Sequence, residues 1–461
     1  MDALGRFFYR MGAGMFFLSV VLLVWRRNHY ITFGVYIPTI KFSDLLLLGS
    51  LIFVCGALLL SHSLRDFLLK EWKAFSRWVF LWGAFICFFI LGSFIGFLVF
   101  HVNFFSGSIE YIRLGIGLTE FFLIIIFGFH NDRYIRLIAY AFFSALLLIP
   151  FLFVSIATIF EWFAVVSPAS YTLLGLQPSP LVLGSFLIIP ATFLFAYVCA
   201  DKTFKKYLAL IGVTFFVALI IWTGSRSAWI SSFIALLSIV LVHARQRAWS
   251  WVALIRGGFF IVLVFLFGFL ILPAPARNTA LVRIFPYLKV DVVVVDNNLV
   301  LPKESEFQHY LLSWTTWDFL RVSSPVVDLG FREDRGAIWM KYGWRFLENP
   351  LGVGPLYASI LPEHNISKQG VNAHNLWLQV ALSGGIGALI VFGYIIFEIG
   401  RRLWRLVWRY ADDVLVLGLA GAFVGMLVNA IFMDTLDIRW FWIILGIITV
   451  IWENKKEEFF I

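Results

Sequence analysis

The chain has 461 residues, of which 61% are hydrophobic and 14% charged, whereas soluble globular domains contain roughly 45–50% apolar and about 25% charged residues. This composition excludes an ordinary soluble protein. The net charge of +9 does not indicate nucleic-acid binding, because the basic residues are spread along the chain and form no interleaved patch.

Long apolar blocks recur along the chain, and most approach the roughly 18–20 residues that a helix needs to cross a membrane. Arg6 and Arg10 precede the first block, but Trp25-Arg26-Arg27 lacks the small residues of a signal-peptide cleavage site, so we expect a retained span. The sequence predicts an all-α polytopic membrane protein with about twelve transmembrane helices, near residues 11–25, 44–60, 78–100, 114–129, 137–158, 181–199, 208–223, 227–242, 251–272, 376–399, 414–432 and 438–452.

The distribution of basic residues predicts the orientation. With a cytoplasmic N-terminus, 20 Lys and Arg residues fall in inner segments and six in short outer loops, and cytoplasmic loops are those that carry the excess. We therefore expect an N-terminal transmembrane region of about nine helices (1–272), a long periplasmic loop with short helices (273–375) and a C-terminal region of about three helices (376–461). The loop carries ten basic and ten acidic residues, so it is neutral overall.

The tightest outer turn contains an arginine. Thr223-Gly224-Ser225-Arg226-Ser227 separates two predicted spans, which puts Arg226 at the start of a membrane helix. Helix N-termini favour phosphate, and a guanidinium adds bidentate hydrogen bonds. A lone interfacial anchor is the alternative interpretation of Arg226.

An amphipathic helix is predicted within the long loop, from Asp334 to Leu347. Four residues fall on one face at helical spacing: Arg335, Trp339, Tyr342 and Phe346. Asn349-Pro350 should end the helix, because the residue before a proline avoids the α region. Arg335 either extends its charged head to water while its stem packs on Trp339, or points into a site beneath the helix.

A histidine opens the tenth predicted span, in Asn372-Ala373-His374-Asn375. The charged form of a histidine is disfavoured at a helix N-terminus, so His374 should be neutral and able to accept a proton. A hydrogen-bonded surface residue is the alternative. His364 and Glu363 do not complete a metal-ligand pattern with it, and no G-x-S-x-G turn indicates a serine hydrolase.

Together, Arg226, Arg335 and His374 could surround a lipid-linked diphosphate at the outer membrane surface. The leaving diphosphate gathers negative charge as the anomeric bond breaks, and fixed cations stabilise that charge. The acceptor hydroxyl needs a base, which a neutral histidine supplies.

The same segments resemble the O-antigen ligase and polymerase superfamily. Gly224-Ser225-Arg226-Ser227-Ala228 is similar to its S-R-[GS]-A turn, and Arg335-x-x-x-Trp339 followed by Asn349-Pro350-Leu351-Gly352-Val353-Gly354 is similar to its loop segment. His374-Asn375-x-x-Leu378 with Gly384, Gly385 and Gly387 is similar to its H-N-x-x-L…G-x-x-G element. The resemblance covers about residues 205–452.

The resemblance implies a GT-C-like glycosyltransferase of the bacterial inner membrane. Such an enzyme would need no metal, no nucleotide and no other cofactor. Its donor would be an undecaprenyl-diphosphate-linked glycan, transferred with inversion to lipid A-core or another glycan acceptor, with membrane lipids around it. Arg226 and Arg335 would hold the diphosphate and His374 would activate the acceptor. Asp434 matches the family's late carboxylate loosely, and Asp437 is an equal candidate.

Within the family, the number of spans and the position of the long loop favour an O-antigen ligase over a repeat-unit polymerase. One polymerase-like R-x10-G spacing does occur, from Arg332 to Gly343. A membrane transporter is the alternative from another class, and a structural scaffold is a further one. A transporter should carry charged residues deep in several spans. Only Glu120 is clearly central, and it could pair with Arg113 on its own helix.

Overall fold

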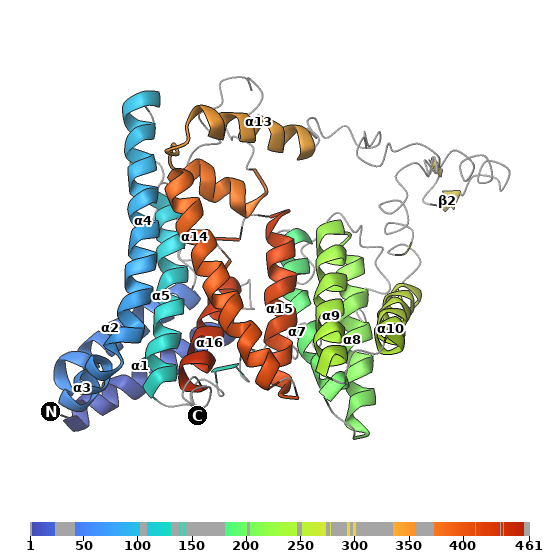
Figure 1. The fold of residues 1–461 in the computed structure, drawn as a ribbon, viewed down its shortest axis with the longest axis horizontal. Coiled ribbons are helices and arrows are strands. Elements are labelled where there is room, and N and C mark those ends of the chain that lie inside the picture. Colours follow the sequence, from blue (N-terminus) through green and yellow to red (C-terminus); the bar gives the residue numbers. More distant parts are fainter. Residues whose placement is uncertain are drawn as a thin grey trace.

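The computed structural model describes residues 2–23, 42–101, 108–130, 180–200, 203–246, 251–272, 335–355, 373–410, 412–433 and 438–455, with the short pieces 138–139, 142, 277, 293–295, 298–300 and 435–436. Figure 1 shows this part of the chain as a set of helices. They are α1 (Asp2–Leu23), α2 (Phe42–Leu60), α3 (His62–Lys70), α4 (Trp72–Phe100), α5 (Ser108–His130), α7 (Pro180–Ala200), α8 (Lys205–Trp222), α9 (Arg226–Gln246), α10 (Trp251–Leu270), α13 (Arg335–Glu348), α14 (Leu376–Arg409), α15 (Val414–Ala430) and α16 (Arg439–Lys455).

Several of these helices are long and apolar enough to cross a membrane. Within the described ranges there are seven, namely α2, α4, α5, α7, α8, α9 and α14, and shorter apolar helices lie in α10 and α15. The prediction of a helical, multi-pass membrane protein is therefore confirmed. The predicted span near 137–158 lies almost wholly outside the described residues.

The structure departs from the all-α prediction at one short hairpin. Strands β1 (Val293–Val295) and β2 (Asn298–Val300) pair antiparallel, with Val294 opposite Leu299. Consecutive valines favour an extended backbone, and the two residues that separate the strands are Asp and Asn, which commonly form turns.

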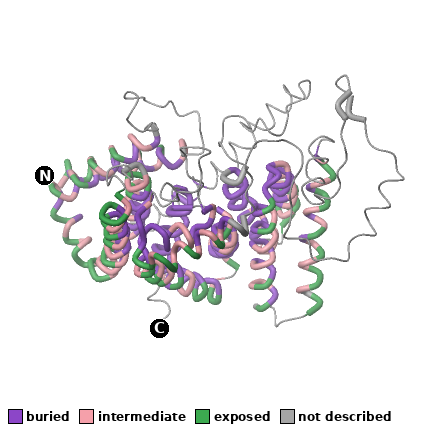
Figure 2. Tube along the Cα trace, turned by 90° about the horizontal axis from the view of Figure 1, so that it is seen from above, coloured by how far each residue is buried: buried purple, intermediate pink, exposed green. Residues whose placement is uncertain are grey.

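The helices pack side by side into a bundle (Figure 1). Helix α4 packs on α14 and α5 on α16, while α7, α8, α9 and α15 form a second group. Helix α13 lies across one end of the bundle, hereafter the α13 end, and both chain termini lie toward the other end. Buried residues gather inside the bundle and exposed ones on its rim (Figure 2). That rim includes large apolar side chains such as Phe80 and Phe397, as a lipid-facing surface requires.

Helix α14 is broken near its start by Gly385, whose φ of 71° and ψ of −169° are not helical. The segment after α13 fills the break. Val353 N donates to Leu382 O (2.7 Å), Gly354 N to Ser383 O (3.0 Å), and Ile386 N donates back to Pro350 O (2.8 Å). Backbone groups that the break leaves without helical partners thus obtain partners from this segment.

Two glycines of α4 allow this docking. A Cβ on Gly92 would lie 2.0 Å from Ser383 O, and a Cβ on Gly96 would lie 2.2 Å from Val353 O. Because no other residue leaves room for a backbone at that distance, α4, the docked segment and the break in α14 form a single packed unit.

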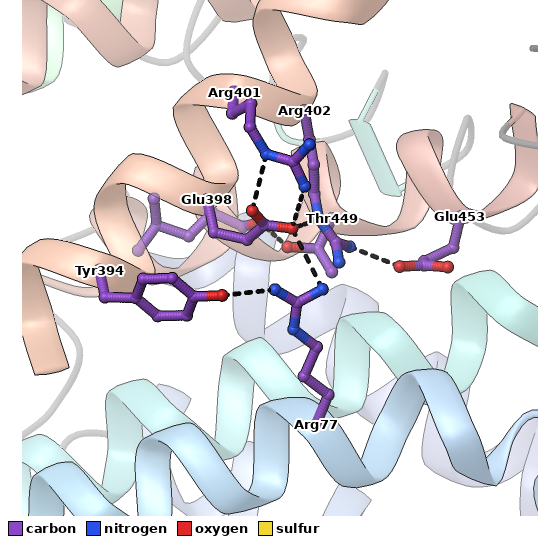
Figure 3. Close-up of polar contacts among 8 residues, drawn as sticks. Arg77, Tyr394, Glu398, Arg401, Arg402, Thr449 and Glu453 are labelled. Atoms are coloured by element: carbon purple, nitrogen blue, oxygen red, sulfur yellow. Dashed lines mark hydrogen bonds and ion pairs between the residues drawn. The ribbon is translucent and has the colours of Figure 1, made fainter.

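A cluster of charged side chains, of which Glu398, Arg402 and Glu453 are buried, joins α4, α14 and α16 (Figure 3). The Glu398 carboxylate lies 2.8 Å from Arg401, 3.0 Å from Arg402 and 3.2 Å from Arg77. Arg402 also pairs with Glu453 of α16. Buried charges are tolerated when they are paired, so the ion pairs of Glu398 and Arg402 connect the three helices.

Candidate functional site

Arg226 begins α9 immediately after a three-residue connection from α8, as the sequence predicts. Gly224 takes a left-handed φ of 64°, and the Ser225 hydroxyl accepts a hydrogen bond from Ala228 N (3.3 Å). This is a serine cap of the kind that begins many helices. Ser225 and Ser227 are buried whereas Arg226 is exposed, so the turn presents the arginine outward from a rigid base.

Helix α9 brings this turn toward the α13 end of the bundle. Gly425 of α15 lies against Ser231 and Ala235, and Gly421 lies against Ile239. The two helices therefore run antiparallel, with the N-terminus of α9 beside the C-terminus of α15. Arg226 consequently shares an end of the bundle with the connection between α15 and α16.

Helix α13 confirms the predicted amphipathic helix, one residue shifted, at Arg335–Glu348. Ile338 and Tyr342 are buried in a small core with Val353, Ala373 and Leu382. Arg335 is the first residue of the helix, and its side chain lies outside the described part of the structure. Apolar packing on one face therefore explains why α13 lies across the bundle.

Trp339 links α13 to the two segments that carry the other predicted site residues. Its indole Nε1 donates to Ala373 O (3.0 Å), directly before His374. Its ring also lies 6.0 Å from the ring of Phe432, at the start of the α15–α16 connection. One side chain thus holds the Arg335 helix, the His374 segment and the region of Asp434 together.

His374 precedes α14 and is half-buried. The helix cap is the next residue, because Asn375 Oδ1 accepts from Leu378 N (3.1 Å). His374 itself has a left-handed φ of 47°, a conformation that is uncommon outside glycine and often found at functional sites. His374 therefore lies directly before the helix cap, and the start of α14 at Leu376 agrees with the predicted start of the tenth span.

Asp434 and Asp437 lie outside the described residues. Their described neighbours Met433, Thr435 and Leu436 are buried. The described residues 433, 435 and 436 of the α15–α16 connection are therefore packed into the protein.

The predicted partner of Glu120 is wrong. Glu120 pairs with Arg439 of α16, while Arg113 pairs with Glu110 at 2.9 Å. Two helical turns, about 10 Å, separate residues 113 and 120 along the helix, whereas Glu110 is one turn from Arg113. Arg439 is one of the six basic residues that the sequence places in short outer loops, but its side chain is buried at 7% exposure.

No group of three His, Cys, Asp or Glu side chains gathers as metal ligands within the part of the chain that the structure describes.

Residues 211–393 match the family described as O-antigen ligase. The matched region contains Arg226, Arg335, His374 and the break at Gly385, and it ends before Asp434. No curated protein matches the chain.

Proposed function

We propose that this chain, whose residues 211–393 match the O-antigen ligase family, acts as a member of the O-antigen ligase and polymerase superfamily and transfers a polysaccharide from undecaprenyl diphosphate to a hydroxyl acceptor. The transfer inverts the anomeric centre and needs no metal or nucleotide. Its natural reaction is the attachment of O-antigen to lipid A-core.

The observation that carries this proposal is the double contact of Trp339. Its hydrogen bond to Ala373 O and its ring contact with Phe432 join two family motifs and the α15–α16 connection at one end of a membrane bundle. The reaction requires a lipid-linked donor and a general base close to each other at a membrane surface. The contacts of Trp339 support this arrangement, because they hold the motifs of Arg335 and His374 together.

In the proposed reaction, Arg226 and Arg335 hold the donor diphosphate. Their guanidinium groups stabilise the negative charge that develops on the leaving group. His374 removes the proton of the acceptor hydroxyl as that oxygen attacks the anomeric carbon. Asp434 or Asp437 orients the base or the acceptor.

We propose that the site faces the periplasm. In this topology the chain crosses the membrane about twelve times and both termini are cytoplasmic. Residues 1–272 and 376–461 form the two transmembrane regions, and residues 273–375 form the periplasmic loop. The excess of basic residues in the inner segments supports it. In a variant lacking Cys55, Cys87 and Cys199, Ser305→Cys should react with an impermeant thiol reagent in intact spheroplasts; reaction only after lysis contradicts the topology.

The function is tested with purified protein in detergent, undecaprenyl-diphosphate-linked glycan and no added metal or nucleotide. Lipid A-core and a second lipid-linked repeat unit are offered as separate acceptors. Product on lipid A-core identifies a ligase, and lengthening of the lipid-linked glycan identifies a repeat-unit polymerase. The proposal fails if neither acceptor is glycosylated.

A further inference from the structure

A small pocket lies between α4, α5, the start of α14 and the end of the segment that docks on α14. Phe89, Tyr111, Pro355, Gln379 and Ser383 contribute to its lining. Its enclosed part has room for a single water-sized group. The pocket is near the α13 end, because Gln379 and Ser383 belong to the first turns of α14, just after His374.

Two polar atoms of residues that line this pocket have no hydrogen-bond partner among the described residues. They are the side-chain oxygen of Gln379 and the hydroxyl of Ser383, and Ser383 is completely buried. Buried polar groups in native proteins are nearly always hydrogen-bonded, so an unpaired pair in one pocket calls for a ligand or an ordered water.

The charges and aromatic rings around these atoms define the chemistry of that ligand. At the rim, Glu110 and Arg113 neutralise each other at 2.9 Å. The Tyr111 hydroxyl is already engaged, since it donates to Phe89 O (2.9 Å) and contacts the Ser93 hydroxyl. The pocket therefore offers a neutral hydrogen-bond acceptor, the Gln379 side-chain oxygen, and the Ser383 hydroxyl, both beside apolar rings. This composition is unsuited to phosphate, which needs cations, and it suits a sugar hydroxyl.

We propose that this pocket receives one hydroxyl or hydroxymethyl group of a sugar ring in the glycan substrate, an inference that rests on the proposed function. The Gln379 carbonyl accepts the proton of the sugar hydroxyl, and Ser383 donates to its oxygen. The rest of the ring stays at the mouth, because the enclosed space is too small for it. Gln379 and Ser383 are then specificity residues that position a sugar near His374.

The test compares two nearly isosteric variants, Ser383→Ala and Gln379→Met, with Ser231→Ala as the matched control. Ser231 is also completely buried with an unpaired hydroxyl, but it lies in α9 away from the pocket. Each pocket variant should raise KM for one substrate about three- to tenfold, the expected loss for one neutral hydrogen bond. KM for lipid-linked donor and for lipid A-core, measured separately, identifies which substrate supplies the sugar.

The melting temperature separates binding from folding. Removing an unpaired buried hydroxyl should leave Tm unchanged or raised, so a rise in KM without a fall in Tm supports the pocket. If KM stays unchanged for both substrates in both variants, the pocket holds an ordered water only and the proposal is overturned.

A binding measurement keeps the result independent of catalysis. Saturation-transfer NMR on the purified protein uses free glucose, galactose and N-acetylglucosamine as probes. The pocket is supported if the contacts with at least one sugar weaken in Ser383→Ala and persist in Ser231→Ala. If this result is obtained but no transfer occurs, the proposed function alone fails. If the unmutated protein shows neither transfer nor sugar contacts, both proposals fail.

Discussion

Arg439, the first residue of α16, forms a buried ion pair with Glu120 of α5, 319 residues away in the chain. The same guanidinium lies 3.0 Å from Asp44 and donates to the Ser19 hydroxyl at 2.8 Å. One side chain therefore joins α1, α2, α5 and α16. Because α16 follows directly on the connection that contains Asp434 and Asp437, this pairing also fixes where that connection ends.

Arg439→Met should destabilise the protein strongly. The substitution leaves Glu120 buried without its cation, and breaking one side of a buried pair costs about 3–5 kcal/mol. We expect a clear fall in Tm, measured by fluorescence-detected size exclusion after heating. The exposed pair of Arg113 with Glu110 is the control, since Arg113→Ala should cost about 0–1 kcal/mol at most.

The double variant Arg439→Met with Glu120→Met should recover part of that loss, because no unpaired carboxylate remains at residue 120. A single Arg439→Met variant as stable as the unmutated protein would show that this pair does not hold α16.

Gly385→Ala should disrupt the docking of the segment after α13. A left-handed residue with ψ near 180° is essentially restricted to glycine and costs about 1–3 kcal/mol otherwise, and the added Cβ would lie 2.4 Å from Leu351 C. Glycan transfer should fall together with Tm. Gly393→Ala, in the same helix with open space around its Cβ, is the control and should stabilise the helix by up to about 1 kcal/mol. Equal effects of the two substitutions would contradict the docking argument.

Much of the fold could be predicted from two sequence signals. Long apolar segments indicate the membrane helices, and apolar residues repeated with a period of 3.6 residues indicate α13. The ends of helices were less predictable. The span expected at 376–399 continues as α14 to Arg409, since its last turns are charged and amphipathic and hydropathy does not detect them. The break at Gly385 was also missed. Gly384, Gly385 and Gly387 look alike in sequence, and only the docking of residues 350–354 determines which one breaks the helix.

The candidate site was predictable where a residue stands at a helix boundary, as Arg226 and His374 do. It was not predictable where partners are distant in sequence. Arg439 looked like a loop residue because counting basic residues at span edges treats buried and exposed ones alike. Gln379 and Ser383 gave no signal, because an unpaired polar atom is recognised only when its surroundings are known.

Arg226→Ala and Arg335→Ala should each abolish glycan transfer without loss of folding or membrane insertion. Lysine at either position should restore little, because a point charge cannot reproduce the bidentate hydrogen bonds of a guanidinium. Transfer is measured on the purified variants, with size exclusion as the check on folding. Arg345→Ala is the matched control, since Arg345 lies in the same helix α13 and pairs with the exposed Glu348 at 2.8 Å. Near-normal transfer by the lysine variants would identify these arginines as membrane anchors.

His374→Asn should separate base catalysis from donor binding. Asparagine tolerates the left-handed backbone that His374 adopts, so the substitution removes the imidazole without straining the start of α14. Loss of a general base typically lowers the rate by about 10²–10⁴-fold, while the affinity for the lipid-linked donor should change little. His101→Asn is the matched control, because His101 is the other described non-glycine residue with a positive φ, and it should keep full activity.

The pH dependence gives a second readout of His374. A base is active when deprotonated, so transfer by the unmutated protein should be present at high pH and lost as the imidazole becomes protonated on acidification. The residual activity of His374→Asn should lack this fall. Rates are measured from single-turnover transfer at saturating donor, which excludes changes in binding. A His374→Asn variant that transfers glycan at the normal rate, or that keeps the acid-side fall of the unmutated protein, would rule out His374 as the base and leave the carboxylates of the α15–α16 connection as the groups to test.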